Sequence, residues 1–438
     1  MSAKALILIG GEKTGTRFRP LSLSTPKVFF PIAGKPLLTH LLESIQATST
    51  PKISEVVLIG FFDTSIINAY IATVENSFTF SIKYYQEPPL MPMGTAGGLY
   101  YFRDEILKPA SGETQPPEHF FLIYADIVCS FPLHEMYTFA NEQRPGPAVD
   151  FVIMGVPHDD DLSSLKNDPQ DNFGSIASIR GEVVHYVEKP ETKISSVING
   201  GVYYFKASIL QDALPEAKKL REERNQANAF LQFHKPNDDE SYSTGNSISW
   251  ERDLVKMLAD KSIPGYRVFC YQYTSYWRQL KTASLVLPAN KLYLEKRPQE
   301  SATSLENVVQ PCYIHPSSFP IPPTAKIGPY VSIGANAAIG PGVRIVKAVI
   351  GSDVTIGQHT FIKNAVVDNQ VAIGEWCRVE GSSNGEVQQA KEGEESDALP
   401  TATVLATDTK VLNEVRVYGG VVLPHKELKL DVLNEIIM

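Results

Sequence analysis

The stretch "LILIGGEKTGTRFRPL", Leu6–Leu21, places an apolar run directly before a glycine-rich segment that carries two arginines. The run "GKPLLTHLLESIQA", residues 34–47, follows with leucines at helical spacing, and a second apolar run, "EVVLIGF", occupies residues 55–61. A strand, a glycine-rich turn, a helix and another strand form the βαβ unit of doubly wound α/β domains. The opening stretch therefore predicts a Rossmann-like α/β domain.

Three further apolar runs extend this pattern: "HFFLIYAD" (119–126), "VDFVIMGV" (149–156) and "GGVYYF" (200–205). They are continuous rather than alternating, which is typical of strands buried on both faces of a mostly parallel sheet. The polar run at residues 234–247 is predicted to be a surface loop. We expect this domain to cover residues 1–290.

A different period begins near residue 321. Aliphatic residues recur every six positions, with two single-residue slips, at Ile327, Ile333, Ile339, Ile345, then Ile350, Ile356, Ile362, then Val367, Ile373, Val379. A period of six fits neither a helix nor an ordinary strand, but it is the period of a parallel β-helix built from hexapeptides. We predict a left-handed parallel β-helix over residues 321–438, joined to the first domain by a linker at 291–320.

The β-helix pattern is interrupted at residues 382–402 by "SSNGEVQQAKEGEESDALPTA". This segment is polar, acidic and poor in large apolar residues, so it cannot bury enough surface to order itself. A solvated insertion is the interpretation that composition favours. A functional arm that orders against a partner is the alternative.

Bulk composition excludes several function classes. The 438-residue chain has a net charge of −9, whereas a nucleic-acid-binding surface would be strongly basic. The four cysteines form no CxxC pair and are expected to be reduced thiols. No apolar run approaches the length of a membrane span, and the N-terminal run is too short for a signal peptide. We expect a cytoplasmic protein without nucleic-acid or membrane partners.

The opening stretch also suggests anion chemistry. Glycines at Gly10, Gly11 and Gly15 let backbone N–H groups approach an anion closely. Arg17 offers a planar fork for phosphate oxygens and Lys27 a mobile positive charge. The order of residues matches neither the Walker loop nor GxGxxG. Taken alone, these residues are equally well explained as a strand-to-helix turn with surface cations.

A series of motifs makes the anion site more specific. In chain order they are "GTRFRPL", "TPK", "GKPLL", "MGTAGGL", "YADIVCSFPL", "YVEKP" and "INGGVYYF". This series, followed by hexapeptide repeats, resembles the sugar-1-phosphate nucleotidyltransferases. Within them, "GTRFRPLS", "GGLYYFRD" and "VLPHKEL" look closest to GDP-mannose pyrophosphorylases of the alpha-type, regulatory kind. Such enzymes join a nucleoside triphosphate to a sugar-1-phosphate mainly by positioning and charge neutralisation.

The resemblance implies a role for each matching residue. Phosphates would be held by Gly10, Gly11, Gly15, Thr16 and Arg17, with Arg17 and Lys27 acting on the triphosphate if the chain is active. The base would face Gln86 and the loop that contains Gly94 and Gly97. The sugar and its phosphate would contact Gly174, Glu188, Lys189 and Asn199.

The metal site departs from the family pattern. Asp126 follows an apolar strand and would be the first Mg²⁺ ligand, since this ion prefers oxygen ligands that include one or two carboxylates. The family's second carboxylate would fall in "SYWRQLKTAS", residues 275–284, where Gln279 takes its place and Lys281 adds a positive charge. Gln279 supplies an amide oxygen without a charge. Magnesium is therefore expected to bind weakly.

The phosphate loop departs as well, because it is two residues longer than the family's loop and carries Glu12. A displacement of about 1 Å can slow a reaction about a hundredfold.

We predict a regulatory, catalytically weak or inactive subunit that binds GDP-mannose and feedback-inhibits a catalytic beta-type partner in a homo- or hetero-oligomer. The alternatives are an active mannose-1-phosphate guanylyltransferase, which makes GDP-mannose from GTP and mannose-1-phosphate, and a non-binding scaffold.

Overall fold

The computed structural model divides the chain into two compact units. The first contains Met1–Gly11 and Leu41–Trp277, and the second contains Glu12–His40 and Arg278–Met438. The structure describes residues 2–11, 16–88, 93–141, 149–157, 173–192, 194–231, 247–296, 305–382 and 402–438. Gly15, nearly all of the predicted insertion at 382–402 and most of the predicted loop at 234–247 lie outside the described residues.

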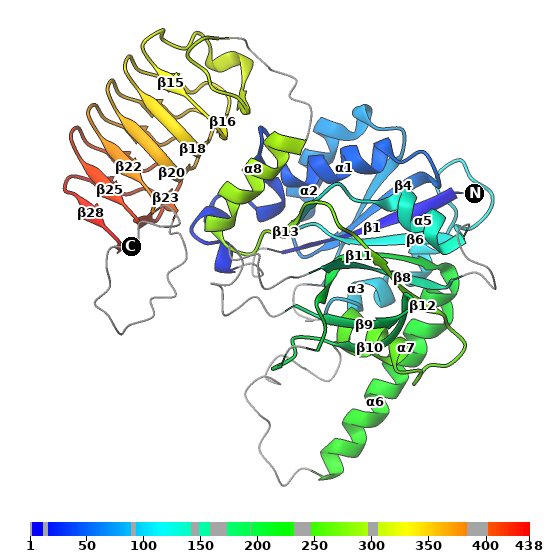
Figure 1. Ribbon diagram of the computed structural model, residues 1–438. Coiled ribbons are helices and arrows are strands. Elements are labelled where there is room, and N and C mark those ends of the chain that lie inside the picture. The colour runs from blue at the N-terminus through cyan, green and yellow to red at the C-terminus, as the bar shows by residue number, and fades with distance from the viewer. Residues whose placement is uncertain are drawn as a thin grey trace. The chain divides into compact units, whose positions relative to one another are not determined.

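The first unit is built on a nine-stranded sheet (Figure 1). Its strands, in spatial order, are β5 (Ser81–Gln86), β4 (Lys52–Gly60), β1 (Ser2–Gly10), β6 (His119–Tyr124), β11 (Val197–Lys206), β8 (Phe151–Pro157), β12 (Val268–Gln272), β10 (Glu182–Val187) and β9 (Ser175–Ile179). All five predicted strands are present, and the predicted first helix is α1 (Leu37–Ala47). The Rossmann-like α/β prediction is confirmed.

The direction of β11 differs from the mostly parallel sheet that we expected. Strands β5, β4, β1 and β6 run parallel to one another, but β11 is antiparallel to both of its neighbours, β6 and β8. Burial on both faces makes a strand continuously apolar whichever way it runs. The run "GGVYYF" therefore reveals that the strand is buried, but not its direction.

The core of the first unit lies against one face of the sheet. Leu6, Val57 and Phe120 pack in one cluster with residues of the helices on that face. These helices are α3 (Gly97–Tyr101), α4 (Arg103–Ile106), the π-helix η5 (Ile209–Ala213), α6 (Leu214–Leu231), the π-helix η7 (Trp250–Val255) and α7 (Lys256–Ala259). Because strand side chains alternate between faces, Ile7 and Phe121 are buried on the opposite face. Further helices of this unit are α2 (Thr64–Val74), the short 3₁₀ helix η4 (Glu75–Ser77) and α5 (Leu133–Asn141).

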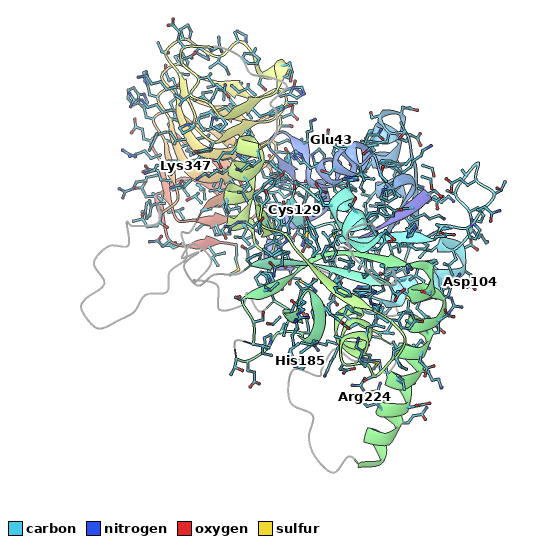
Figure 2. The ribbon with its side chains drawn as sticks, turned by 45° about the vertical axis from the view of Figure 1, so that its right-hand side comes forward. Glu43, Asp104, Cys129, His185, Arg224 and Lys347 are labelled. Carbon is cyan, nitrogen blue, oxygen red and sulfur yellow. The ribbon has the colours of Figure 1, made fainter. Side chains whose placement is uncertain are left out.

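The four cysteines are free and buried, in keeping with the predicted reduced thiols. Figure 2 shows Cys129 among the packed side chains of the first unit, whereas Asp104 and Arg224 lie on its outside. Among the described helices, none combines the length and the apolar character that a membrane crossing requires.

The second unit contains a parallel β-helix, as the six-residue period predicts (Figure 1). Within the described residues, every pair of strands in the β-helix is parallel. Its strands are β14 (Cys312–Ile314), β15 (Lys326–Ile327), β16 (Val331–Ile333), β17 (Ala338–Ile339), β18 (Arg344–Ile350), β19 (Thr355–Ile356), β20 (Phe361–Val367), β21 (Ala372–Ile373), β22 (Arg378–Glu380), β23 (Thr403–Leu405), β24 (Lys410–Val411), β25 (Arg416–Tyr418), β26 (Val421–Val422), β27 (Glu427–Leu428), β28 (Val432–Leu433) and β29 (Ile436–Ile437).

The strand register explains the first slip in the period. Ile327 pairs with Ile345, 18 residues later, but Ile333 pairs with Ile350, only 17 residues later. The missing residue lies inside β18, where the buried Ile345 and Ile350 are five positions apart. A coil of three hexapeptides thus loses one residue where two sides of the coil share one strand.

The strand pairs also bracket the acidic segment. Lys363 pairs with Glu380, 17 residues later, whereas Ala365 pairs with Thr403, 38 residues later. The excess of 21 residues equals the length of the segment 382–402. The coils therefore continue in register on both sides of it.

The predicted linker at 291–320 contains regular structure. It includes the end of α8 (Val286–Lys296) and the strand β14, which pairs with β16 of the β-helix. The domain boundaries at 290 and 320 stay a prediction.

Helix α8 joins the segment 12–40 to the β-helix within the second unit. Asn290 on this helix is fully buried, and its Oδ1 accepts hydrogen bonds from the Ala33 amide at 2.8 Å and from Ser332 Oγ at 2.6 Å. Its Nδ2 donates to the Tyr330 carbonyl oxygen at 3.3 Å. One amide side chain therefore fastens the segment that carries Lys27 to the first coils.

We expect Asn290→Ala to lower the free energy of unfolding by about 2 kcal/mol, because the Ala33 amide and the Ser332 hydroxyl lose their buried acceptor. Urea denaturation measures the effect. Lys291→Ala is the matched control, since that side chain is 51% exposed and its loss should change little. Equal midpoints for the two variants would contradict this role of Asn290.

Candidate functional site

The glycines at the end of β1 are required by packing. Gly10 has a φ of 70°, and its carbonyl oxygen accepts a hydrogen bond from the Phe61 amide at 2.8 Å. A Cβ on Gly11 would overlap the Phe61 side chain. These contacts lie at the carboxyl ends of the parallel strands β1 and β4, the edge where α/β sheets bind ligands. The glycines thus have a structural reason that holds with or without a bound phosphate.

The predicted base-facing loop is held by backbone pairing with the chain that precedes η7. The Ala96 amide donates to the Ile248 carbonyl oxygen at 3.0 Å, and the Ile248 amide donates to the Met93 carbonyl oxygen at 2.8 Å. Gly94 has a φ of 76°, and a Cβ there would overlap the Ile248 carbonyl oxygen. A Cβ on Gly97 would overlap the Met93 side chain. Both glycines are therefore needed for this pairing.

A buried carboxylate that the sequence did not single out lies beside this loop. Glu87 follows β5 and is only 5% exposed. Burial raises its pKa to about 7, although a hydrogen bond from the Gly98 amide acts in the opposite direction. The neighbouring Gln86 is exposed, and its Oε1 accepts from Thr64 Oγ1 at 2.8 Å. Two prolines follow Glu87 in "QEPP", which is typical of a loop, so no local pattern indicated that this carboxylate is buried.

The structure brings together three of the predicted sugar-side residues. Asn199 Nδ2 donates to the hydroxyls of Tyr203 at 2.7 Å and Tyr186 at 3.0 Å. Tyr186 in turn donates to Glu188 Oε2 at 2.6 Å. The Asn199 amide donates to the Gly174 carbonyl oxygen at 2.8 Å, and a Cβ on Gly174 would overlap the Tyr186 hydroxyl.

The bonding of Asn199 changes what we expect of it. Its Nδ2 contacts two tyrosines and its Oδ1 accepts from the Gly201 amide at 3.0 Å, so its side-chain groups are already engaged. A direct hydrogen bond from Asn199 to a sugar hydroxyl would compete with these bonds. Glu188 is the better candidate for that contact. Lys189, next along the chain, is exposed and has a φ of 51°.

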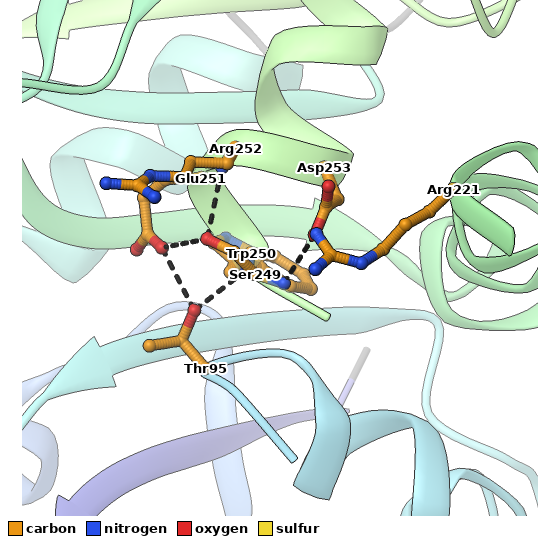
Figure 3. A network of polar contacts seen from close by, with 7 residues as sticks. All are labelled: Thr95, Arg221, Ser249, Trp250, Glu251, Arg252 and Asp253. Carbon is orange, nitrogen blue, oxygen red and sulfur yellow. Dashed lines mark hydrogen bonds and ion pairs between the residues drawn. The ribbon is translucent and has the colours of Figure 1, made fainter. Parts of the chain in front are cut away.

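Glu251 is a second residue that sequence reasoning missed. It lies in η7, and its Oε2 accepts two hydrogen bonds, one from Thr95 Oγ1 at 3.0 Å and one from Ser249 Oγ at 3.2 Å (Figure 3). Tyr124 and Tyr203 donate to Oε1, the latter at 3.3 Å. The sequence signal that could have indicated Glu251 is the group of charged residues inside the otherwise apolar run "ISWERDLV", residues 248–255.

Two carboxylates therefore share this buried region. Burial raises the pKa of Glu188, and the negative charge of Glu251 raises it further. The hydrogen bond from Tyr186 and the positive charges of Lys189 and Arg252 act in the opposite direction.

The two predicted metal ligands belong to different units, so a magnesium site formed by them stays a prediction. Asp126 lies two residues beyond β6, and Gln279 ends β13 (Trp277–Gln279). One carboxylate and one neutral amide are a poor donor set for Mg²⁺. Among the described residues there is also no group of three His, Cys, Asp or Glu side chains that could hold a metal ion. The indole of Trp277, which precedes Gln279, donates to the Gly200 carbonyl oxygen at 3.0 Å.

The remaining predicted phosphate contacts belong to the second unit. Thr16 and Arg17 are exposed in a 3₁₀ helix, Thr16–Phe18, whose buried Phe18 packs edge-to-face on Phe30 at 5.5 Å. Lys27 begins another 3₁₀ helix, η3 (Lys27–Phe29), and is partly buried. Apolar anchors therefore hold a short segment that presents cations. The division of the predicted contacts between two units leaves the assembled phosphate site a prediction.

Comparison with known proteins finds two matching families, one for each major part of the sequence. Residues 4–278 match the nucleotidyl transferase family, and residues 308–438 match the GMPPB C-terminal domain. A probable mannose-1-phosphate guanyltransferase from Schizosaccharomyces pombe is 35% identical over the whole of both chains. Mannose-1-phosphate guanylyltransferase regulatory subunits are similar too: alpha-A from Danio rerio at 35% and alpha from Rattus norvegicus at 34% identity, each over 99% of this chain and 100% of the relative.

Full-length relatives at this level of identity and two matching domains leave one assignment. The order of the motifs in the first 278 residues and the β-helix that follows agree with it. The chain belongs to the mannose-1-phosphate guanylyltransferase family of nucleotidyltransferases, which includes proteins named as regulatory alpha subunits.

Proposed function

We propose that this chain is a regulatory, catalytically weak subunit that binds GDP-mannose and restrains a catalytic, beta-type guanylyltransferase subunit. The observation that carries the proposal is Gln279, a neutral amide where a second carboxylate would complete a magnesium site. The residues assigned to the sugar, by contrast, form a connected cluster around Asn199. A site that recognises the product but handles Mg²⁺ and triphosphate poorly suits a sensor.

The names of two relatives support the regulatory part of this proposal, because both are regulatory alpha subunits. Inhibition of a partner by the product would be feedback, in which two sites are coupled through an assembly. The acidic segment 382–402 is our candidate for the partner contact, since it leaves a β-helix whose coils continue in register on either side.

An active guanylyltransferase is the second candidate. The relative from Schizosaccharomyces pombe, named as a probable transferase, favours it. So do Asp126, Arg17 and Lys27, which retain the charges that the reaction needs.

Binding to the purified chain separates these candidates. We expect calorimetry to find GDP-mannose bound at least about tenfold more tightly than GTP with Mg²⁺, because the sugar-side cluster is intact and the metal donor set is not. Turnover of GTP and mannose-1-phosphate should fall far below the common value of about 10 s⁻¹. Turnover near that value would establish the active enzyme instead.

Gln279→Asp is expected to strengthen Mg²⁺-dependent GTP binding, because it restores the missing charge. Gln272→Asp, at the exposed end of β12, is the matched control and should leave GTP binding unchanged. An equal response of the two variants would show that position 279 has no part in metal binding.

A further inference from the structure

Four hydroxyl groups converge on the carboxylate of Glu251. Thr95 and Ser249 donate to Oε2 at 3.0 and 3.2 Å, while Tyr124 and Tyr203 donate to Oε1. An ionised carboxylate has about four acceptor sites and no donor. All of its capacity is therefore used inside the protein, and Glu251 is suited to hold neighbours in place rather than to contact a ligand.

The two oxygens of Glu251 serve different parts of the first unit. Oε2 binds Thr95 of the predicted base-facing loop, and Thr95 Oγ1 also accepts from the Trp250 amide at 2.8 Å, which fixes the hydroxyl (Figure 3). Oε1 binds Tyr203, which reaches the sugar-side cluster through Asn199. One carboxylate thus links the two predicted halves of the nucleotide-sugar site.

The direction of each hydrogen bond in the cluster follows from this carboxylate. Because Tyr203 gives its hydrogen to Glu251, its oxygen remains an acceptor for Asn199 Nδ2. Asn199 gives its other amide hydrogen to Tyr186, which passes its own hydrogen to Glu188. When both end groups are ionised, this chain of hydrogen bonds has a single arrangement of its protons.

We propose that Glu251 is a positioning residue that, through Tyr203 and Asn199, orients Glu188 for the sugar of a nucleotide sugar and links it to the base-facing loop. The inference rests on the proposed function, because it assumes that the sugar binds beside Glu188. Replacing one oxygen of Glu251 by an amide group would put a donor against hydroxyls that are already donating. Some of these hydroxyls must then reverse, and a reversal at Tyr203 opposes the amide of Asn199.

Glu251→Gln tests the inference at nearly constant size. We expect the dissociation constant for GDP-mannose to rise about tenfold or more, while that for GDP, which lacks the sugar, changes less than about threefold. If Glu251 had a purely structural role, the variant would weaken the binding of GDP-mannose and GDP together, and the ratio of their dissociation constants would stay the same. An unchanged ratio in folded Glu251→Gln protein would overturn the inference.

Asp253→Asn is the matched control. Asp253 lies in the same π-helix and is 3% exposed, and its substitution is the same change from acid to amide. Its carboxylate has different partners, however, because it pairs with Arg221 at 2.5 Å and accepts a hydrogen bond from the Ser249 amide at 2.7 Å (Figure 3). It should reduce thermal stability without changing the ratio of the two dissociation constants. A ratio shifted as far by Asp253→Asn as by Glu251→Gln would also overturn the inference.

Tyr203→Phe and ligand-free crystal structures complete the test. If Glu251 acts through Tyr203, the double variant Glu251→Gln/Tyr203→Phe should change the ratio of the two dissociation constants no more than either single variant does, since both substitutions break the same path. Additive changes in this ratio would contradict the inference. If the wild-type chain binds no GDP-mannose, the proposed function fails, but the ligand-free structures still decide the inference. Asn199 and Glu188 should be displaced in Glu251→Gln and not in Asp253→Asn, and unchanged positions would refute it.

Discussion

Gly94→Ala is expected to destabilise the first unit by about 3 to 5 kcal/mol. The φ of 76° by itself costs an alanine about 1 to 2 kcal/mol. The larger part comes from the Cβ, which would overlap the Ile248 carbonyl oxygen and lie 2.9 Å from its carbon. Backbone atoms cannot rotate away, so the hydrogen bonds that join Ile248 to Met93 and Ala96 must lengthen or break.

Gly112→Ala separates backbone strain from overlap. Gly112 has a similar φ of 82°, but a Cβ there would meet nothing within 4 Å. Chemical denaturation should show a loss of only about 1 to 2 kcal/mol for this control. Equal losses for the two variants would mean that the pairing of the base-facing loop with Ile248 contributes nothing. Because Thr95 follows Gly94, we also expect Gly94→Ala to weaken GDP-mannose binding.

Glu87→Gln is expected to remove a large pH dependence of stability. Burial raises the pKa of Glu87 from 4.5 to about 7 in the folded protein. Above pH 4.5 the unfolded chain releases this proton while the folded chain keeps it, so stability falls as the pH rises until the folded group ionises near 7. The shift corresponds to about 3 kcal/mol in total, of which about 2 to 3 kcal/mol is lost between pH 5 and pH 8.

The variant should therefore be more stable relative to wild type at pH 8 than at pH 5, by about 2 to 3 kcal/mol. Urea denaturation at the two pH values gives this difference directly. Glu75→Gln, which changes an exposed carboxylate, should show no comparable difference. If the stability of Glu87→Gln relative to wild type were the same at both pH values, Glu87 would be ionised in the folded protein throughout.

Glu87 and Glu251 also bear on how the base-facing loop is built. One accepts a hydrogen bond from the Gly98 amide and the other from the Thr95 hydroxyl, so both carboxylates hold the same short loop. At neutral pH Glu87 is partly protonated, whereas Glu251 is surrounded by donors. The loop is thus held by two acidic side chains from different parts of the chain, Glu87 after β5 and Glu251 in η7.

Features that depend on local periodicity could be predicted from the order of the residues. Continuous apolar runs located all five predicted strands, because burial on both faces leaves no room for polar residues. A period of six located the coils of the β-helix, because each side of a coil buries one aliphatic residue against the next. The order of short motifs indicated the family, because so many motifs in one order make a chance match improbable.

Which side chains meet follows only from the three-dimensional arrangement of the chain. Thr95 and Glu251 are 156 positions apart, and no local pattern at either position indicates the other. The direction of β11 and the attachment of the segment 12–40 to the β-helix were equally invisible, because burial of a run does not specify its neighbours. Periodicity records how far a residue is buried, whereas a hydrogen bond between distant residues depends on how the whole chain is arranged, and that arrangement places Glu251 between the two predicted halves of the site.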